Sequence, residues 1–411
     1  MPYRAASTLD ATFFHRREPL SMNTVKNNPM FIYLMVLTIS STFGLQAWRT
    51  LFDNFAVNVV VLDGGHIGVL QSIREIPGFL SLLVIYFLYI IKEHRLSALS
   101  VLILGVGVAV TGFFPTFHGL ILTTLIMSFG FHYFETTNQS LTLQYFNTLQ
   151  APLVFGRLRS LAAASNIFTG VVIFFLAPFL TYIQLYLLFG GLIIAAALWS
   201  LGRNPVDKNI VPQHKKMIFK RKYWLFYVLT FLAGARRQIF IAFAVFLLVK
   251  KFEYSVSEIA LLFLVNNGIN FFLSPYIGKC INRFGERKVL SLEYFSLIFI
   301  FVSYAFVESK VVVAILYIGD HIFFNFAIAI RTFFHKIAQS EDIAPSMAVG
   351  FTINHIAAVF LPVLGGLLWL INYRIPFIAG AVLSLASLIF VQLITAEIDK
   401  NQSDKQQKAL S

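Results

Sequence analysis

Long apolar runs separated by short polar breaks recur along the whole chain. A helix rises about 1.5 Å per residue, so about 20 apolar residues are needed to cross the hydrocarbon core of a bilayer. Runs of this length predict twelve membrane-spanning helices, at residues 30–61, 67–91, 96–115, 118–146, 160–180, 183–202, 223–249, 257–278, 289–307, 311–336, 347–370 and 375–396. The runs are too long and continuous for barrel strands, so the pattern indicates an all-α membrane protein.

The composition agrees with a chain that folds in lipid. Of its 411 residues, 58% are hydrophobic and 12% are charged, and the mean hydropathy is +0.76. Too few polar side chains remain to cover a water-soluble particle of this size. The single cysteine, Cys280, excludes an intramolecular disulfide and a zinc site built from cysteines. We therefore expect helix packing to hold the fold together, with no metal and no cofactor.

The net charge of +13 is explained by membrane topology. With the N-terminus in the cytoplasm, 23 of the 32 lysines and arginines fall in segments on the inner side of the membrane. Inner loops of membrane proteins carry such an excess of positive charge. We therefore expect a multi-pass protein of the cell inner membrane, with both termini cytoplasmic and no nucleic-acid partner.

The polar segments also predict the domain organisation. A basic stretch at 203–222 separates two six-helix bundles, at 29–202 and 223–398. It is interpreted as a solvated linker that sets topology, with a lipid-binding or partner-binding patch as the alternative. Residues 1–28, within which Met22 is an alternative start, and residues 399–411 are expected to form cytoplasmic tails without fixed structure.

The two bundles resemble each other in sequence. The pattern R-x-x-F-x-x-F-A-V begins at Arg49 in the first span and at Arg237 in the seventh, an offset of 188 residues. G-x-H-x-F recurs around His132 in the fourth span and His321 in the tenth, at an offset of 189. Matches at nearly one offset predict a parallel repeat about an axis along the membrane normal.

A loop after the eighth span resembles a family motif. It reads Gly278-Lys-Cys-Ile-Asn282-Arg283-Phe-Gly285-Glu-Arg287-Lys288 and is similar to the G-x-x-x-D-R-x-G-R-R/K loop of the major facilitator superfamily, with Asn282 in place of Asp. Pro362-Val-Leu-Gly365-Gly366 looks like the end of that family's G-P-x-x-G-G element. The resemblance implies two six-helix bundles that carry solutes by alternating access, with spans one, four, seven and ten lining the central cavity.

The same loop is a candidate gate. Gly278 and Gly285 permit a tight turn, while Arg283 and Arg287 can pair with carboxylates or helix C-terminal carbonyls at the cytoplasmic side. The alternative is that these arginines only set topology.

Ionisable residues within spans are the candidate chemistry, because charge at bilayer depth persists where it faces a cavity or another charge. The candidates for substrate binding are Arg49, Arg237, His132, His321, Trp48 and Arg236, and those for proton coupling are Glu135, Asp53 and Asp320. Glu135 is the preferred proton carrier, because it lies one turn from His132 and has no arginine on its own span. Each arginine or histidine could instead be a structural partner of a neighbouring group, and Arg74 with Glu75 could pair near the outer interface.

The chain lacks the sequence motifs of enzymes and ATP-driven pumps. No G-x-x-x-x-G-K-S/T phosphate loop, H-E-x-x-H or G-x-S-x-G appears in it. We predict a monomeric secondary transporter that binds a small organic solute with an anionic group and exchanges protons. The runner-up is a membrane receptor of the same fold that transports nothing, and a channel is third.

Overall fold

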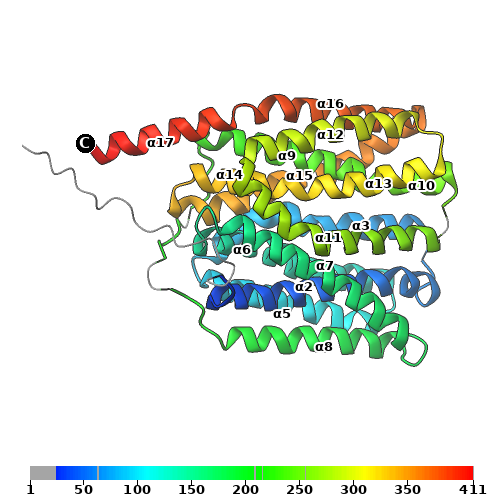
Figure 1. The fold of residues 1–411 in the computed structure, drawn as a ribbon. Coiled ribbons are helices and arrows are strands. Elements are labelled where there is room, and N and C mark those ends of the chain that lie inside the picture. The colour runs from blue at the N-terminus through cyan, green and yellow to red at the C-terminus, as the bar shows by residue number, and fades with distance from the viewer. Residues whose placement is uncertain (1–24, 63, 208–209, 215, 255, 411) are drawn as a thin grey trace, which may run out of the picture.

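The structure is a computed structural model that describes residues 25–62, 64–207, 210–214, 216–254 and 256–410 (Figure 1). Residues 1–24, most of the first predicted tail, lie outside the described residues. The N-terminal half comprises α2 (Pro29–Asn58), α3 (Gly64–Phe79), η2 (Leu80–Leu83), α4 (Val84–Phe87), α5 (Glu93–Val110), η3 (Thr111–Phe113), α6 (Phe117–Tyr145), α7 (Ala151–Leu176) and α8 (Tyr182–Leu201).

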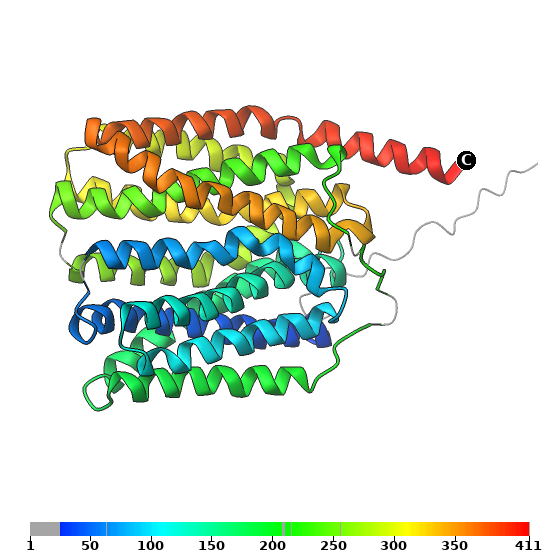
Figure 2. The same ribbon diagram turned by 180° about the vertical axis from the view of Figure 1, so that it is seen from behind.

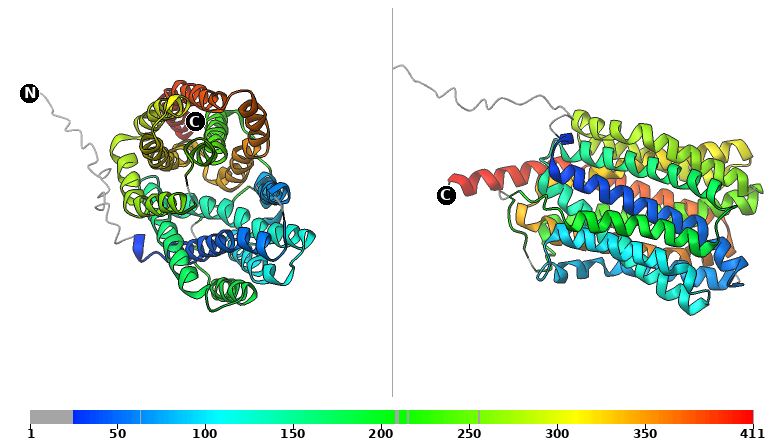
Figure 3. Two further views of the ribbon diagram at one scale, coloured as in Figure 1. Left: turned by 90° about the vertical axis from the view of Figure 1, so that its right-hand side faces the viewer. Right: turned by 90° about the horizontal axis from the view of Figure 1, so that it is seen from below.

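The C-terminal half repeats this order of long helices after the linker. It comprises η4 (Arg221–Tyr223), α9 (Trp224–Ile239), η5 (Phe240–Ala244), α10 (Val245–Phe252), α11 (Val256–Phe284), α12 (Glu286–Phe306), α13 (Lys310–Phe324), η6 (Asn325–Ala327), α14 (Ile328–Ile337), η7 (Ser340–Asp342), α15 (Ile343–Ile371), α16 (Arg374–Val391) and α17 (Ile394–Leu410). The two halves lie side by side when the bundle is seen end-on (Figure 3). The predicted all-α fold is confirmed.

Among the described residues, eleven helices are long and apolar enough to cross a membrane. The remaining predicted span, the seventh at 223–249, corresponds to α9, η5 and α10 together. Arg236 and Arg237 lower the hydropathy of this span, and η5 directly after them is a π-helical turn that interrupts the helix. Such turns are frequent at functional sites.

The start of α2, the linker and α17 lie at one end of the bundle, which we call the terminal end, and we call the opposite end the far end (Figures 1 and 2). Small residues allow α5 to pack closely within the N-terminal half. A Cβ on Gly107 or Gly130 would meet the backbone of the neighbouring helix, and one on Gly190 would meet Ala109. Close backbone approach at small residues is how helices associate in lipid.

The linker is not simply a solvated chain. Its second part contacts Asp342, which is fully buried beside α15. Lys220 lies 2.7 Å from this carboxylate, His214 3.0 Å and the Tyr223 hydroxyl 2.5 Å. The linker is thus anchored to the C-terminal half by charge-assisted hydrogen bonds.

The C-terminal residues from 399 onward, expected to lack fixed structure, continue helix α17 to Leu410. Trp224 donates a hydrogen bond to Glu397 (3.0 Å), and Asn401 donates one to the Lys336 carbonyl (3.3 Å). These contacts and a run of good helix formers explain why the helix continues beyond the last span.

Candidate functional site

The two halves pack backbone to backbone near the terminal end. Cβ atoms on Gly156 of α7 and Gly278 of α11 would collide with the carbonyls of Ser274 and Pro152 in the opposite helix. Ser160 donates a hydrogen bond to the Phe271 carbonyl across the same contact, at 2.6 Å. Only glycine permits this approach of α7 to α11.

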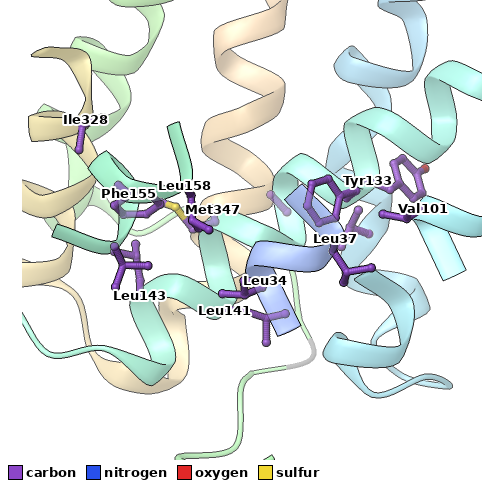
Figure 4. Close-up of a cluster of buried hydrophobic side chains, with 14 of the residues drawn as sticks. Leu34, Leu37, Val101, Tyr133, Leu141, Leu143, Phe155, Leu158, Ile328 and Met347 are labelled. Atoms are coloured by element: carbon purple, nitrogen blue, oxygen red, sulfur yellow. The ribbon is translucent and has the colours of Figure 1, made fainter. Parts of the chain in front are cut away.

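Apolar side chains close the space between the halves at this level. Figure 4 shows Phe155 and Leu158 of α7 beside Met347 of α15, with Leu143 of α6 and Ile328 of α14 near them. All five are buried and belong to one core cluster. We call these five residues the apolar seal. They fill space between α6 and α7 of one half and α14 and α15 of the other.

The loop that was predicted to be a gate contributes glycine and asparagine contacts to this closure. Gly278 lies in the α7–α11 contact, and Asn282 donates a hydrogen bond to the Leu149 carbonyl of the N-terminal half (2.7 Å). Gly285, with φ +80°, forms the turn into α12. Arg283 and Arg287 are exposed.

We expect Gly278→Val to open the terminal end, because the added side chain would push α7 away from α11. Overpacking costs about 1–3 kcal/mol, so the share of open molecules should rise about fivefold or more. Alkylation of Cys280, which is half-buried beside this contact, should accelerate accordingly. Gly268→Val is the matched control, because a Cβ there meets open space on the same helix. Equal alkylation rates in Gly278→Val and Gly268→Val would refute the role of the glycine contact. An unchanged rate in Arg283→Ala would mean that Arg283 only sets topology.

A cluster of charges from both halves lies beside the apolar seal. Glu135 of α6 interacts electrostatically with Arg331 of α14, Arg159 of α7 and Arg237 of α9. Arg159 also donates to the Asn325 side chain across the interface (3.2 Å), and Arg331 lies 5.6 Å from the ring centre of Phe155. We call Glu135, Arg159, Arg237 and Arg331 the central cluster. Its members come from four helices and join the two halves at mid-bundle.

A second group of charges extends from the central cluster. Arg74 and Glu75 on α3 form an ion pair at 2.7 Å, and Glu75 also interacts with Arg237. Arg49 on α2 interacts with Arg74 and with Asp53. Arg74 and Glu75 are thus coupled to the central cluster, whereas the sequence suggested a pair near the membrane surface.

Some of these charges keep solvent-exposed surface although they lie within spans. Arg49, Asp53 and Arg159 are exposed. Arg49 interacts with Tyr317 of the other half, so it faces across the interface and not toward lipid. The exposed surface of these side chains is compatible with a site between the halves that solutes can reach.

His132 contacts residues of other helices and not Glu135, its neighbour on α6. Its ring centre is 4.9 Å from that of His355 on α15, and it interacts with Glu75. Glu135 instead hydrogen-bonds Gln139 on its own helix. The spacing of three residues therefore does not bring His132 and Glu135 together as predicted.

Arg236 and Asp320 lie inside the C-terminal half, away from the interface. The side chains of Arg236 and Glu293 are 0% exposed and 3.6 Å apart, and Arg236 also contacts Ser387 and stacks over the Tyr294 ring at 4.3 Å. Asp320 is fully buried and interacts with Arg236 and Glu293. Arg236 is thus placed as a structural partner of buried carboxylates.

Two other candidates make contacts within one half. His321 lies 2.7 Å from the Asn270 amide, and Asn270 accepts a hydrogen bond from Asn325 (2.5 Å). Trp48 is fully buried and stacks on Phe52, with ring centres 4.1 Å apart. Trp48 therefore packs in the core of the N-terminal half.

Three residues of these clusters are not among the candidates that the sequence indicates. The predicted span at 160–180 leaves Arg159 outside it, because the apolar run begins after this residue, yet α7 begins at Ala151. His355 and Glu293 were not singled out, although both are ionisable residues within predicted spans. That feature alone could have found them.

Comparisons with known proteins identify the family. A sequence profile of the Major Facilitator Superfamily matches residues 27–341. A bacterial homologue of the iron transporter ferroportin, solved in an outward-facing state, is similar at 14% identity and a TM-score of 0.67 over 91% of this chain and 99% of that chain. The human organic anion transporter MFSD10 (TETRAN) gives 10% identity and a TM-score of 0.68, with 88% and 99% covered.

FucP, a Major Facilitator Superfamily transporter solved in the outward conformation, gives 13% identity and a TM-score of 0.65, with 89% of this chain and 98% of that chain covered. No curated protein matches the sequence. At these identities the solved structures show a shared fold. The profile match and the fold together establish that the chain belongs to the major facilitator superfamily, as a multi-pass membrane transporter and not an enzyme.

Proposed function

We propose that this transporter carries a small organic anion by secondary active transport, coupled to protons. The observation that carries the proposal is the central cluster, in which three guanidinium groups from both halves interact electrostatically with one carboxylate. Cations at bilayer depth mark substrate pathways in membrane proteins. A site between the halves is also where a repeat-built transporter binds its substrate.

The charge of the region favours an anionic substrate. Five arginines interact there with three carboxylates: Arg49, Arg74, Arg159, Arg237 and Arg331 with Asp53, Glu75 and Glu135. With all of these groups ionised, two positive charges remain uncompensated. An arginine fork binds a carboxylate or phosphate through two parallel hydrogen bonds, so a solute bearing such a group complements the site.

Glu135 supplies a mechanism for proton coupling. In the empty transporter the carboxylate of Glu135 interacts with the guanidinium groups, and a substrate anion competes with it for them. An anion that occupies Arg237 and Arg159 displaces Glu135, which then takes up a proton because an unpaired carboxylate is costly in this buried setting. Binding of the anion and binding of the proton therefore favour each other.

The transport cycle alternates the opening of the two ends. In this proposal the apolar seal and the α7–α11 glycine contact form the closed gate at the terminal end, and Arg49 and Arg159, which keep exposed surface, are reached from the far end. The excess of positive charge on the terminal-end loops favours a cytoplasmic terminal end in the inner membrane. In the proposed cycle this conformation is the outward-facing one, the transporter works as a monomer, and rocking of the halves exposes the site to the cytoplasm.

Transport by purified protein in liposomes tests this function. A panel of labelled monocarboxylates, dicarboxylates and phosphate esters is compared with their neutral amides and alcohols. We expect saturable uptake of at least one anion, stimulated by an acidic exterior and lost with a protonophore, and no uptake of its neutral analogue. Saturable binding without flux would instead establish the receptor alternative, and preferred uptake of neutral solutes would refute the anion site.

A further inference from the structure

Three ligand-type side chains from both halves meet beside the central cluster. Glu75 of α3, His132 of α6 and His355 of α15 each place one potential metal-ligand atom within 4.8 Å of the others. The Nε2 atom of His355 lies 4.0 Å from Oε2 of Glu75. The two histidines are buried, with 5% and 3% of their surface exposed. We call these three residues the histidine cluster.

The hydrogen bonds orient His355 for coordination. Its Nδ1 lies 2.9 Å from the Phe351 carbonyl, so Nδ1 carries the proton and donates it there. The lone pair of Nε2 then points toward Glu75. A backbone carbonyl that fixes the tautomer in this way is a common partner of metal-binding histidines. The Phe351 ring, stacked on the imidazole at 4.5 Å, fixes its plane.

Two further observations mark the cluster as a built site. Nδ1 of His132 is buried and has no hydrogen-bond partner, which costs free energy that a ligand would recover. Helix α3 also leaves space for the imidazole from the other half, because a Cβ on Gly78 would collide with the His355 ring. His355 can therefore cross the interface only because residue 78 is glycine.

We propose that the histidine cluster binds a divalent first-row transition-metal ion such as Zn²⁺ or Co²⁺. Two imidazole nitrogens and one carboxylate oxygen form a three-ligand set that suits these ions and leaves a coordination position open. Arg74 occupies the other oxygen of Glu75 at 2.7 Å, and Arg237 also interacts with Glu75. These positive charges disfavour Mg²⁺ and Ca²⁺, which depend on several oxygen ligands, more than ions with strong imidazole affinity.

Metal binding draws the two halves together. Ligand atoms around such an ion lie about 3.5 Å apart, so the cluster must contract from its present spread of up to 4.8 Å. His355 belongs to one half and the other two ligands to the other half. An occupied site therefore stabilises the conformation in which α3 and α15 are close.

Cobalt absorption spectroscopy of the purified full-length protein tests the proposal. Titration with Co²⁺ should give visible bands that saturate at one ion per chain, that Zn²⁺ abolishes and that excess Mg²⁺ leaves unchanged. His132→Ala and His355→Ala should each weaken Co²⁺ binding at least about tenfold. His118→Ala is the matched control, because this imidazole is exposed at the start of α6 and should leave the affinity unchanged.

Gly78→Ala gives a test that keeps all three ligands. The added methyl group should displace His355 and weaken Co²⁺ binding. The variant should keep the elution profile and helix content of the wild type, which shows that it still folds. The proposal would be overturned if the wild type gave no saturable Co²⁺ bands. It would also be overturned if His132→Ala, His355→Ala and Gly78→Ala all bound Co²⁺ as tightly as the wild type. The spectra require no transport, so the metal site and the proposed anion transport can fail independently.

Discussion

Arg237→Ala is expected to weaken binding of the transported anion by about 30-fold or more while leaving a folded, membrane-inserted protein. Arg237 lies in the central cluster between Glu135 and Glu75, and it belongs to the half opposite both carboxylates. Removing one partner of a buried charge pair typically costs about 2–5 kcal/mol, and each 1.4 kcal/mol is about a factor of ten in affinity. Arg237→Lys should recover part of the loss, since it keeps the charge and loses the bidentate fork.

The measurement is equilibrium binding of the labelled anion to purified protein, with folding checked by thermal unfolding. Arg203→Ala serves as the control, because Arg203 is exposed at the end of α8 and removes the same charge far from the cluster. Should Arg237→Ala bind the anion as tightly as the wild type does, the central cluster is not the anion site.

The helices could be predicted from the sequence because the bilayer imposes a simple rule. Every backbone group in lipid must be paired within its own helix, so each span appears as an apolar run of sufficient length. The same rule misplaces residues at span ends. Arg159 is charged, so it falls outside the predicted span. Helix α7 nevertheless includes it, because its guanidinium group interacts with Glu135 and hydrogen-bonds Asn325. Likewise, the polar helix α17 has no apolar run to reveal it.

The partners of the buried charges could not be predicted, because they depend on which way each helix faces. Neighbouring residues on a helix point about 100° apart, so Arg236 and Arg237 cannot both face the interface. The structure turns Arg237 toward Glu135 and Arg236 toward Glu293. Of Arg236 and Arg237, the repeat pattern singles out Arg237, because Arg237 matches Arg49. Both matched arginines lie on the interface side. The contact between His132 and His355 joins two halves and has no local signature.

Glu135→Gln is expected to abolish the dependence of transport on the proton gradient while exchange of labelled for unlabelled anion continues. Glutamine keeps the shape of the side chain and can still hydrogen-bond Gln139, but it neither competes for the guanidinium groups nor takes up a proton. One proton carried per anion converts a gradient of about one pH unit, worth about 1.4 kcal/mol, into tenfold accumulation. The variant should therefore equilibrate the anion without concentrating it.

Liposomes with an imposed pH gradient measure this effect, and the two modes of transport separate coupling from binding. Loss of both exchange and accumulation would mean that Glu135 is needed to organise Arg159, Arg237 and Arg331, and full accumulation in the variant would exclude it as the proton carrier. The role would then pass to Asp53 or Asp320. Asp320 is fully buried, and neither of its carboxylate oxygens has a hydrogen-bond partner. An ionised carboxylate in that position is costly unless Arg236 compensates it, so a change in the contact between Arg236 and Asp320 during the cycle would let Asp320 take up and release a proton.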